Sequence, residues 1–162
     1  MALQPIATTG DEILGQQAVA VTVFDRQLHS LADDMMDTML AANGVGIAAP
    51  QIHYPLAMFI MASRPNDRYP EAPLMEPLVL VNPELIGASV ELESGEEGCL
   101  SVPGKRVNIL RHTWVDARYQ DLQGQWHRSK FEGFAARIFQ HELDHLKGIT
   151  LLERANEPEL QA

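Results

Sequence analysis

A six-residue motif at residues 140–145 (QHELDH) constrains the fold of this chain more than any other segment. Apolar side chains recur at helical spacing around it, which predicts a helix over residues 133–147 that stops at Gly148. At roughly 100° per residue, the apolar side chains share one stripe: Phe134, Ala135, Ile138, Phe139 and Leu146. Three ionisable residues fall within that stripe: His141, Glu142 and His145. The opposite side or its margin is expected to hold Gln140, Asp144 and Lys147.

The two histidines lie one helical turn apart, so both imidazoles can reach one ion from the same face. Burying three unpaired ionisable groups is costly, and a divalent metal would satisfy all of them. The histidines would ligate the metal, and Glu142 would accept a hydrogen bond from its bound water. The alternative is a surface helix with incidental histidines, because an HExxH string also occurs by chance.

The single cysteine, Cys99, is the candidate for a third metal ligand. It lies in residues 96–101 (EEGCLS), where the turn-like context would expose a thiol. A lone cysteine is more often a small buried hydrophobe, but the accompanying HExxH motif reverses that preference. Two histidines and a thiolate are compatible with Zn²⁺ or Fe²⁺. The other histidines stand in no ligand-like pattern: His29, His53, His112 and His127.

A run of small residues at 44–51 (GVGIAAPQ) could lie against an extended substrate or another strand. It lacks the GxGxxG spacing and the preceding strand of a dinucleotide site. A helix C-cap followed by tight packing explains it about as well. Two basic residues near the cysteine, Arg106 and Arg111, are expected to be solvated charges or partners of buried acids such as Asp144.

The remaining pattern predicts an α+β fold, with antiparallel strands packed around a central helix that carries HExxH. Residues 25–42 are predicted to form a helix with Asp25 as its N-cap and Asn43-Gly44 as its stop. Strands are predicted at residues 56–61, 78–81, 90–93, 106–110, 113–119, 125–131 and 149–152. The segment 63–77, with four prolines, is expected to be an excursion or flap. One domain would span residues 1–162, with 153–162 as a frayed polar tail.

Composition argues against several classes of protein. Twelve basic residues against 22 acidic ones give a formal net charge of -10, which disfavours binding to DNA or to anionic membranes. No apolar run approaches the roughly 20 residues of a membrane span, and the N-terminus has no secretory-signal pattern. A lone cysteine cannot form an internal disulfide, so we expect a cytoplasmic location.

Taken together and in this order, GVGIAAPQ, EGCLS and QHELDH resemble the three signature motifs of the peptide deformylases. The resemblance covers about residues 25–152 and is looser at residues 10–15, where Glu12 and Gly15 replace the family's usual Pro and Arg. It implies metal-dependent removal of the formyl group from the N-terminal methionine of nascent polypeptides, with release of formate. An N-formylmethionyl peptide would be the substrate, and the ribosome near its exit tunnel a transient partner.

The resemblance also implies roles for individual residues. The family's metal ligands map onto Cys99, His141 and His145, and its catalytic glutamate maps onto Glu142. Its oxyanion donors map onto the Gln51 side-chain amide and the Leu100 backbone N–H. One divalent metal is implied, Fe²⁺ in the cell, with Zn²⁺ or Ni²⁺ tolerated.

Substrate contacts are predicted from the helix face and from the small-residue loop. Phe134 and Ile138 share the face of His141 and, with Val45, could line an apolar slot for an unbranched thioether side chain. Gly44 and Gly46 flank Val45 and would let the loop backbone approach the peptide.

Two other functions fit part of the pattern. A catalytically silent, metal-binding peptide-recognition module would keep the fold, and a zincin endopeptidase would keep HExxH. The intact Glu142, Gln51 and Cys99 favour the deformylase over the silent module. The cysteine ligand and the short chain disfavour the zincin.

Overall fold

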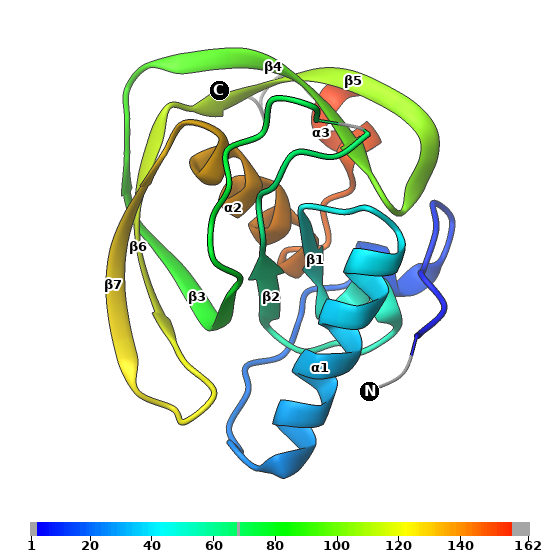
Figure 1. Cartoon of the computed structure of the whole chain (residues 1–162), viewed down its shortest axis with the longest axis vertical. Helices are drawn as coiled ribbons and strands as arrows, with labels where there is room; N and C mark the ends of the chain where they lie inside the picture. The colour runs from blue at the N-terminus through cyan, green and yellow to red at the C-terminus, as the bar shows by residue number, and fades with distance from the viewer. Residues whose placement is uncertain (1–2, 68, 157–162) are drawn as a thin grey trace.

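The computed structural model describes residues 3–67 and 69–156 of the 162-residue chain. Figure 1 traces its elements, where η marks a 3-10 helix. In chain order they are η1 (Glu12–Gly15), α1 (Arg26–Ala41), β1 (Gly46–Ala48), η2 (Ala49–Ile52), β2 (Met58–Met61), β3 (Leu78–Ala88), β4 (Leu92–Cys99), β5 (Val102–His112), β6 (Trp114–Gln120), β7 (Trp126–Glu132), α2 (Gly133–Leu146) and α3 (Leu151–Asn156).

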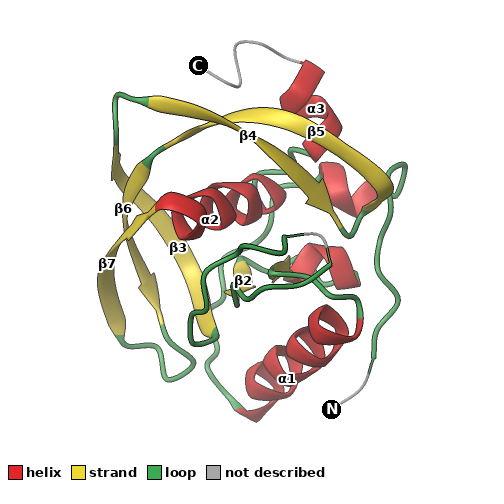
Figure 2. Ribbon diagram, turned by 45° about the horizontal axis from the view of Figure 1, so that its top comes forward, coloured by secondary structure: helices red, strands yellow, loops and turns green. Residues whose placement is uncertain are grey.

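The strands form two antiparallel sheets. The larger has the order β1-β2-β3-β6-β7, and the smaller pairs β4 with β5. Figure 2 shows β4 and β5 arching over α2, which also contacts β1, β2, β6 and β7. The predicted α+β class with antiparallel strands is confirmed. Among the described residues, no helix is long and apolar enough to cross a membrane.

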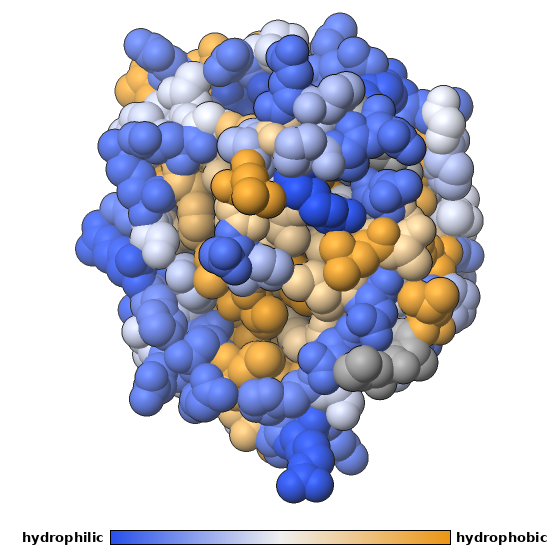
Figure 3. Space-filling model, viewed as in Figure 1, coloured by the Kyte–Doolittle hydropathy of each residue, from blue (hydrophilic) through white to orange (hydrophobic). Residues whose placement is uncertain are grey.

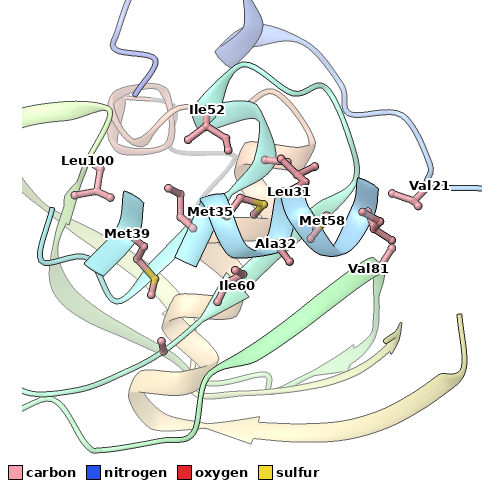
Figure 4. Close-up of a cluster of buried hydrophobic side chains, with 14 residues drawn as sticks. Val21, Leu31, Ala32, Met35, Met39, Ile52, Met58, Ile60, Val81 and Leu100 are labelled. Carbon is pink, nitrogen blue, oxygen red and sulfur yellow. The ribbon is translucent and has the colours of Figure 1, made fainter. Parts of the chain in front are cut away.

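Helix α1 begins and ends as its sequence predicts. The Asp25 carboxylate accepts the Leu28 N–H at 3.1 Å, which satisfies one of the free donors at the first turn. Asn43 adopts a left-handed conformation with φ 58° just after the helix. The apolar face of α1 packs against β1 and β2 in a buried cluster (Figure 4) that includes Leu31, Met35, Met39, Ile47, Met58 and Ile60. This cluster supports the loop that follows α1.

A second buried cluster lies between α2 and the larger sheet. The ring of Phe139 meets that of Phe59 edge-on, with centroids 5.4 Å apart. Other members come from the same helix and from β3 and β6: Ile138, Leu143, Leu146, Leu80, Val115 and Ala117. The packing fixes the rotation of α2, so that its histidines face the smaller sheet and the loop after α1.

Gln140 and Asp144, which were placed opposite the apolar stripe of α2 or at its margin, are both buried there. The Gln140 amide exchanges two hydrogen bonds of 2.9 Å with the backbone of His112 on β5. The Asp144 carboxylate accepts hydrogen bonds from Arg111 at 2.7 Å and from Arg154 at 3.0 Å. The smaller sheet and α3 therefore cover the polar side of α2 and satisfy its side chains. Arg111 was expected to be either a solvated charge or the partner of a buried acid such as Asp144. The structure shows the second.

The prediction of a strand at residues 149–152 is wrong, because helix α3 begins at Leu151. Thr150 and Glu153 form a reciprocal cap: the Glu153 carboxylate accepts the Thr150 N–H at 3.2 Å, and the Thr150 hydroxyl accepts the Glu153 N–H at 3.3 Å. This Thr-x-x-Glu spacing is a helix-start signal. Residues 153–156 of the predicted frayed tail therefore lie in a helix, and residues 157–162 lie outside the described residues.

The strand predicted at residues 90–93 is misplaced, since β4 runs from Leu92 to Cys99 and Val90 is almost fully exposed. The sequence of β4 is charged and lacks the apolar pattern of a strand, because it pairs with β5 in a two-stranded sheet and most of its first residues are exposed. The segment 63–77 contains no helix or strand in its described part, as predicted. The small-residue run holds a short strand, β1, paired with β2.

Candidate active site

Cys99, His141 and His145 come together from two elements that are far apart in sequence. Cys99 ends β4, where the register shifts: Gly98 pairs with Arg106, but Cys99 pairs with Val102. The histidines project from α2. One ligand atom from each of the three residues lies within 4.8 Å of the other two, and Cys99 Sγ is 3.4 Å from His145 Nε2. Such a donor set can hold one metal ion.

A carboxylate behind this cluster orients one of the histidines. Glu97 accepts a hydrogen bond from His141 Nδ1 at 2.9 Å, which leaves Nε2 of that ring free to face the cluster. Arg111 donates to both Glu97 oxygens at 2.9 Å, and Arg137 donates at 2.6 Å. Burial raises the pKa of Glu97, but the hydrogen bonds from Arg111 and His141 outweigh it and hold that pKa well below its usual range. The carboxylate therefore stays ionised.

The cluster also favours the thiolate form of its cysteine. Burial opposes ionisation of Cys99, yet the adjacent His145 and His141 lower the pKa of its thiol well below the usual range. Burial likewise opposes the charged form of His141, but the Cys99 and Glu97 contacts raise the pKa of this histidine. A thiolate is the form of cysteine that binds metals.

Glu142 lies in the same pocket with one oxygen unsatisfied. Its side chain is buried, and Oε1 has no hydrogen-bond partner among the described residues. Burial raises the pKa of Glu142 to about 7. A Cβ added at Gly46 would lie 2.6 Å from Glu142 Oε2 and 3.0 Å from Ile138 Cγ2. The backbone at the start of β1 therefore lies directly against the carboxylate, whose Oε1 is buried without a partner among the described residues.

Gln51 presents an N–H group to the cysteine. The Ala48 N–H donates to Gln51 Oε1 at 2.9 Å, which fixes the orientation of the amide. Its Nε2 donates to the Ser101 hydroxyl at 3.1 Å and lies 3.7 Å from Cys99 Sγ. Leu100 follows Cys99 in the turn between β4 and β5. Both predicted oxyanion donors therefore lie next to the cluster of Cys99, His141 and His145.

The structure brings every predicted site residue into or beside one pocket. Two of the three cluster residues, Cys99 and His141, line this pocket together with Glu142, Gln51 and Leu100. The five predicted substrate contacts line it as well: Gly44, Val45, Gly46, Phe134 and Ile138. His145 lies behind Cys99 and completes the cluster. Apolar side chains gather near the middle of the face in Figure 3, with hydrophilic residues around them.

Sequence reasoning missed four lining residues: Tyr69, Glu97, Gly98 and Arg137. Glu97 lies within the cysteine motif EGCLS, two residues before Cys99, and the need of a buried arginine for an acidic partner was a signal that could have identified it. Tyr69 lies in the proline-rich segment, and nothing in its spacing links it to the other motifs. Among the described residues, the cluster that could hold a metal ion does not include the other four histidines, His29, His53, His112 and His127.

Comparison with known proteins agrees with this geometry. Residues 3–161 match the family model described as polypeptide deformylase. The chain belongs to the peptide deformylase family. It is 63% identical over 155 residues to peptide deformylase 2 of Shewanella oneidensis, covering 96% of this chain and 86% of that protein. It is 46% identical over 153 residues to peptide deformylase 2 of a Nostoc species, covering 94% and 86% respectively.

Solved structures of family members share its fold. A class I type b peptide deformylase from Acinetobacter baumannii, bound to Met-Ala-Ser, superposes with a TM-score of 0.92 at 48% identity and covers 94% of this chain and 98% of that one. The peptide deformylase of Thermotoga maritima gives a TM-score of 0.87 at 35% identity, covering 96% and 99%. The chain is therefore an enzyme that removes the N-formyl group from nascent polypeptides, in a reaction that depends on a metal.

Proposed function

We propose that this pocket carries out deformylation with Cys99, His141 and His145 as the ligands of one metal ion and Glu142 as the general acid/base. The observation that supports this most directly is the convergence of three ligand atoms within 4.8 Å beside the unpaired, buried Glu142 oxygen. In this proposal α2 is the central element of one catalytic domain, residues 1–162, because it carries HExxH between the two sheets.

The residues around the cluster divide the chemistry between them. The bound metal would polarise the formyl carbonyl and make the attacking water more acidic. Glu142 accepts a proton from that water and passes it to the departing amine, so its carboxylate must be within reach of both. Negative charge develops on the former carbonyl oxygen, where the Gln51 side-chain N–H and the Leu100 backbone N–H would donate hydrogen bonds.

Fe²⁺ is the proposed metal in the cell, with Zn²⁺ or Ni²⁺ as replacements. A thiolate is a soft ligand and imidazoles are borderline, a set that these ions accept and that Mg²⁺ and Ca²⁺ do not favour. The cytoplasm is the proposed location and the ribosome near its exit tunnel the proposed transient partner, because the substrate is a nascent chain. No DNA or membrane is needed for this role.

The test is formate release from formyl-Met-Ala-Ser by protein purified without oxygen, with the bound metal measured on the same sample. The relative from Acinetobacter baumannii is described as bound to Met-Ala-Ser, which supports this choice of peptide. Formate release with about one iron per chain is expected. Bound metal without formate release would indicate a silent peptide-recognition module, and casein hydrolysis without deformylation would indicate an endopeptidase.

Replacing Gln51 with alanine should lower kcat by roughly one to three orders of magnitude while leaving the metal content unchanged, because a donor to the developing oxyanion is lost. The measurement is steady-state kinetics together with metal analysis. A serine replacement at Gln123, which lies in the exposed turn between β6 and β7, serves as the control. Loss of metal from Gln51→Ala would give Gln51 a structural role instead.

Formyl-Met-Ala-Ser should be turned over far more efficiently than formyl-Gly-Ala-Ser. Val45, Phe134 and Ile138 supply apolar lining for the first side chain, and each buried CH₂ contributes about 0.8 kcal/mol. The difference should therefore reach about 10²-fold in kcat/KM. Equal kcat/KM values for the two peptides would refute the assignment of the apolar pocket.

A further inference from the structure

Tyr69 connects three separate parts of the molecule at the pocket. It belongs to the proline-rich segment between β2 and β3, and it lines the pocket. Its hydroxyl accepts the Gly98 N–H at 2.8 Å and lies 3.4 Å from the Gly98 carbonyl oxygen. Its ring lies 4.9 Å from the ring of Phe134 at the start of α2, and the Arg106 guanidinium lies 4.8 Å from the ring centroid.

The backbone around Tyr69 holds the side chain in this position. The Tyr69 N–H donates to the Asn66 side chain at 3.1 Å, and the Tyr69 carbonyl accepts the Ala72 N–H at 3.1 Å. Arg64, in the same segment, donates to the Gly44 carbonyl at 2.8 Å and so ties this segment to the small-residue loop. The segment is therefore anchored to both sides of the pocket through side chains of its own.

The contact with Gly98 is informative because of where Gly98 lies. Strand β4 has one sheet partner, β5, so its other edge is open toward the pocket. The Tyr69 hydroxyl meets both backbone groups of Gly98 at that edge, one residue before Cys99. Tyr69 therefore supports the backbone that carries the cysteine while its ring faces the apolar lining.

We propose that Tyr69 is a specificity-determining residue, whose ring forms with Phe134 an aromatic wall that selects formyl peptides with a long, unbranched first side chain. The proposal rests on the proposed function, since it concerns the pocket assigned there to the substrate. An aromatic wall gives a slender aliphatic or thioether chain close contact on its flat face and leaves too little room for a bulky ring. Removing the wall takes away that contact and opens space beside Phe134.

The experiment compares formyl-Met-Ala-Ser with formyl-Phe-Ala-Ser as substrates of four iron-loaded proteins: wild type, Tyr69→Ala, Tyr69→Phe and Tyr54→Ala. Tyr54 is the matched control because its side chain is exposed and is not part of the pocket lining. For Tyr69→Ala, the preference for Met over Phe should fall by about tenfold, mainly through a higher KM for the Met peptide. Tyr69→Phe keeps the wall and should retain the preference within about twofold. Tyr54→Ala should match wild type.

An unchanged preference in Tyr69→Ala would overturn the proposal, and so would an equal loss of kcat on both peptides with lower metal content, because that pattern indicates a structural role alone. If Tyr69→Ala does not fold, Tyr69→Leu provides the same readout with a smaller change in volume. Failure of the wild type to release formate contradicts the proposed function. An active wild type with an insensitive Tyr69→Ala contradicts only the role of Tyr69.

Discussion

Glu142→Gln should lose about 10³-fold or more in kcat on formyl-Met-Ala-Ser and keep its bound metal. The carboxamide fills nearly the same space as the carboxylate, so the lining formed by Gly46 and Ile138 should be preserved. It cannot accept the proton of the attacking water, however, so both proton transfers assigned to Glu142 fail. Stopped-time formate assays and metal analysis of the same preparation measure the two quantities.

Glu84→Gln is a suitable control for Glu142→Gln, because Glu84 is half exposed on β3 and pairs with Arg118 at the surface. It removes a carboxylate of the same kind outside the pocket lining and should retain full activity. Turnover by Glu142→Gln close to that of wild type would remove Glu142 from the role of general acid/base. Loss of metal from this variant would mean that the carboxylate supports the ligand cluster instead.

The second large effect is expected at the thiolate. Cys99→Ser replaces a soft anionic ligand with a weak neutral one, and Cys99→Asp restores an anion as a hard oxygen ligand. Both should lower deformylation by at least about 10²-fold, since the charge and the donor atom next to His145 change together. Zinc content after dialysis should be higher in Cys99→Asp than in Cys99→Ser.

Ser89→Ala is the control for the loss of activity and metal expected from the Cys99 variants. Ser89→Ala removes a buried hydroxyl in the turn before β4, whose hydrogen bonds go to Glu91, Thr113 and Trp114 and not to the cluster. This change should alter thermal stability more than metal content. A Cys99→Ser protein with full metal content and full activity would show that another residue is the third ligand, and the proposed ligand set would then be wrong.

The sequence was most informative where structure is determined locally. Helical periodicity placed His141, Glu142 and His145 on one face of α2, and the Asp25 cap marked the start of α1, because both patterns depend on neighbours within a turn or two. The link between Cys99 and the histidines came from the order of the three motifs. That link spans more than 40 residues, and no local pattern encodes it.

The predictions that depended on distant partners were the weakest. The helical angles placed Gln140 and Asp144 opposite the apolar stripe of α2 or at its margin, but they did not show that β5 and α3 cover that side. There the His112 carbonyl accepts from Gln140, and Arg111 and Arg154 donate to Asp144. Glu97 and Tyr69 were missed because their roles depend on residues of other elements. Glu97 on β4 pairs with Arg111 on β5, and Tyr69 in the proline-rich segment contacts Gly98 on β4. Hydrophobic periodicity detects buried apolar side chains and not buried polar ones that are satisfied.

Gly46 is constrained by space and not by its backbone dihedral angles, because it is not among the glycines with positive φ. Even a methyl group there would collide with the Glu142 carboxylate and crowd Ile138. The smallest possible replacement, alanine, thus acts on the reacting centre itself and not on the conformation of the loop. Side-chain size and not backbone freedom therefore limits substitution at Gly46, whereas a Cβ added at Gly15 would meet no atom within 4 Å.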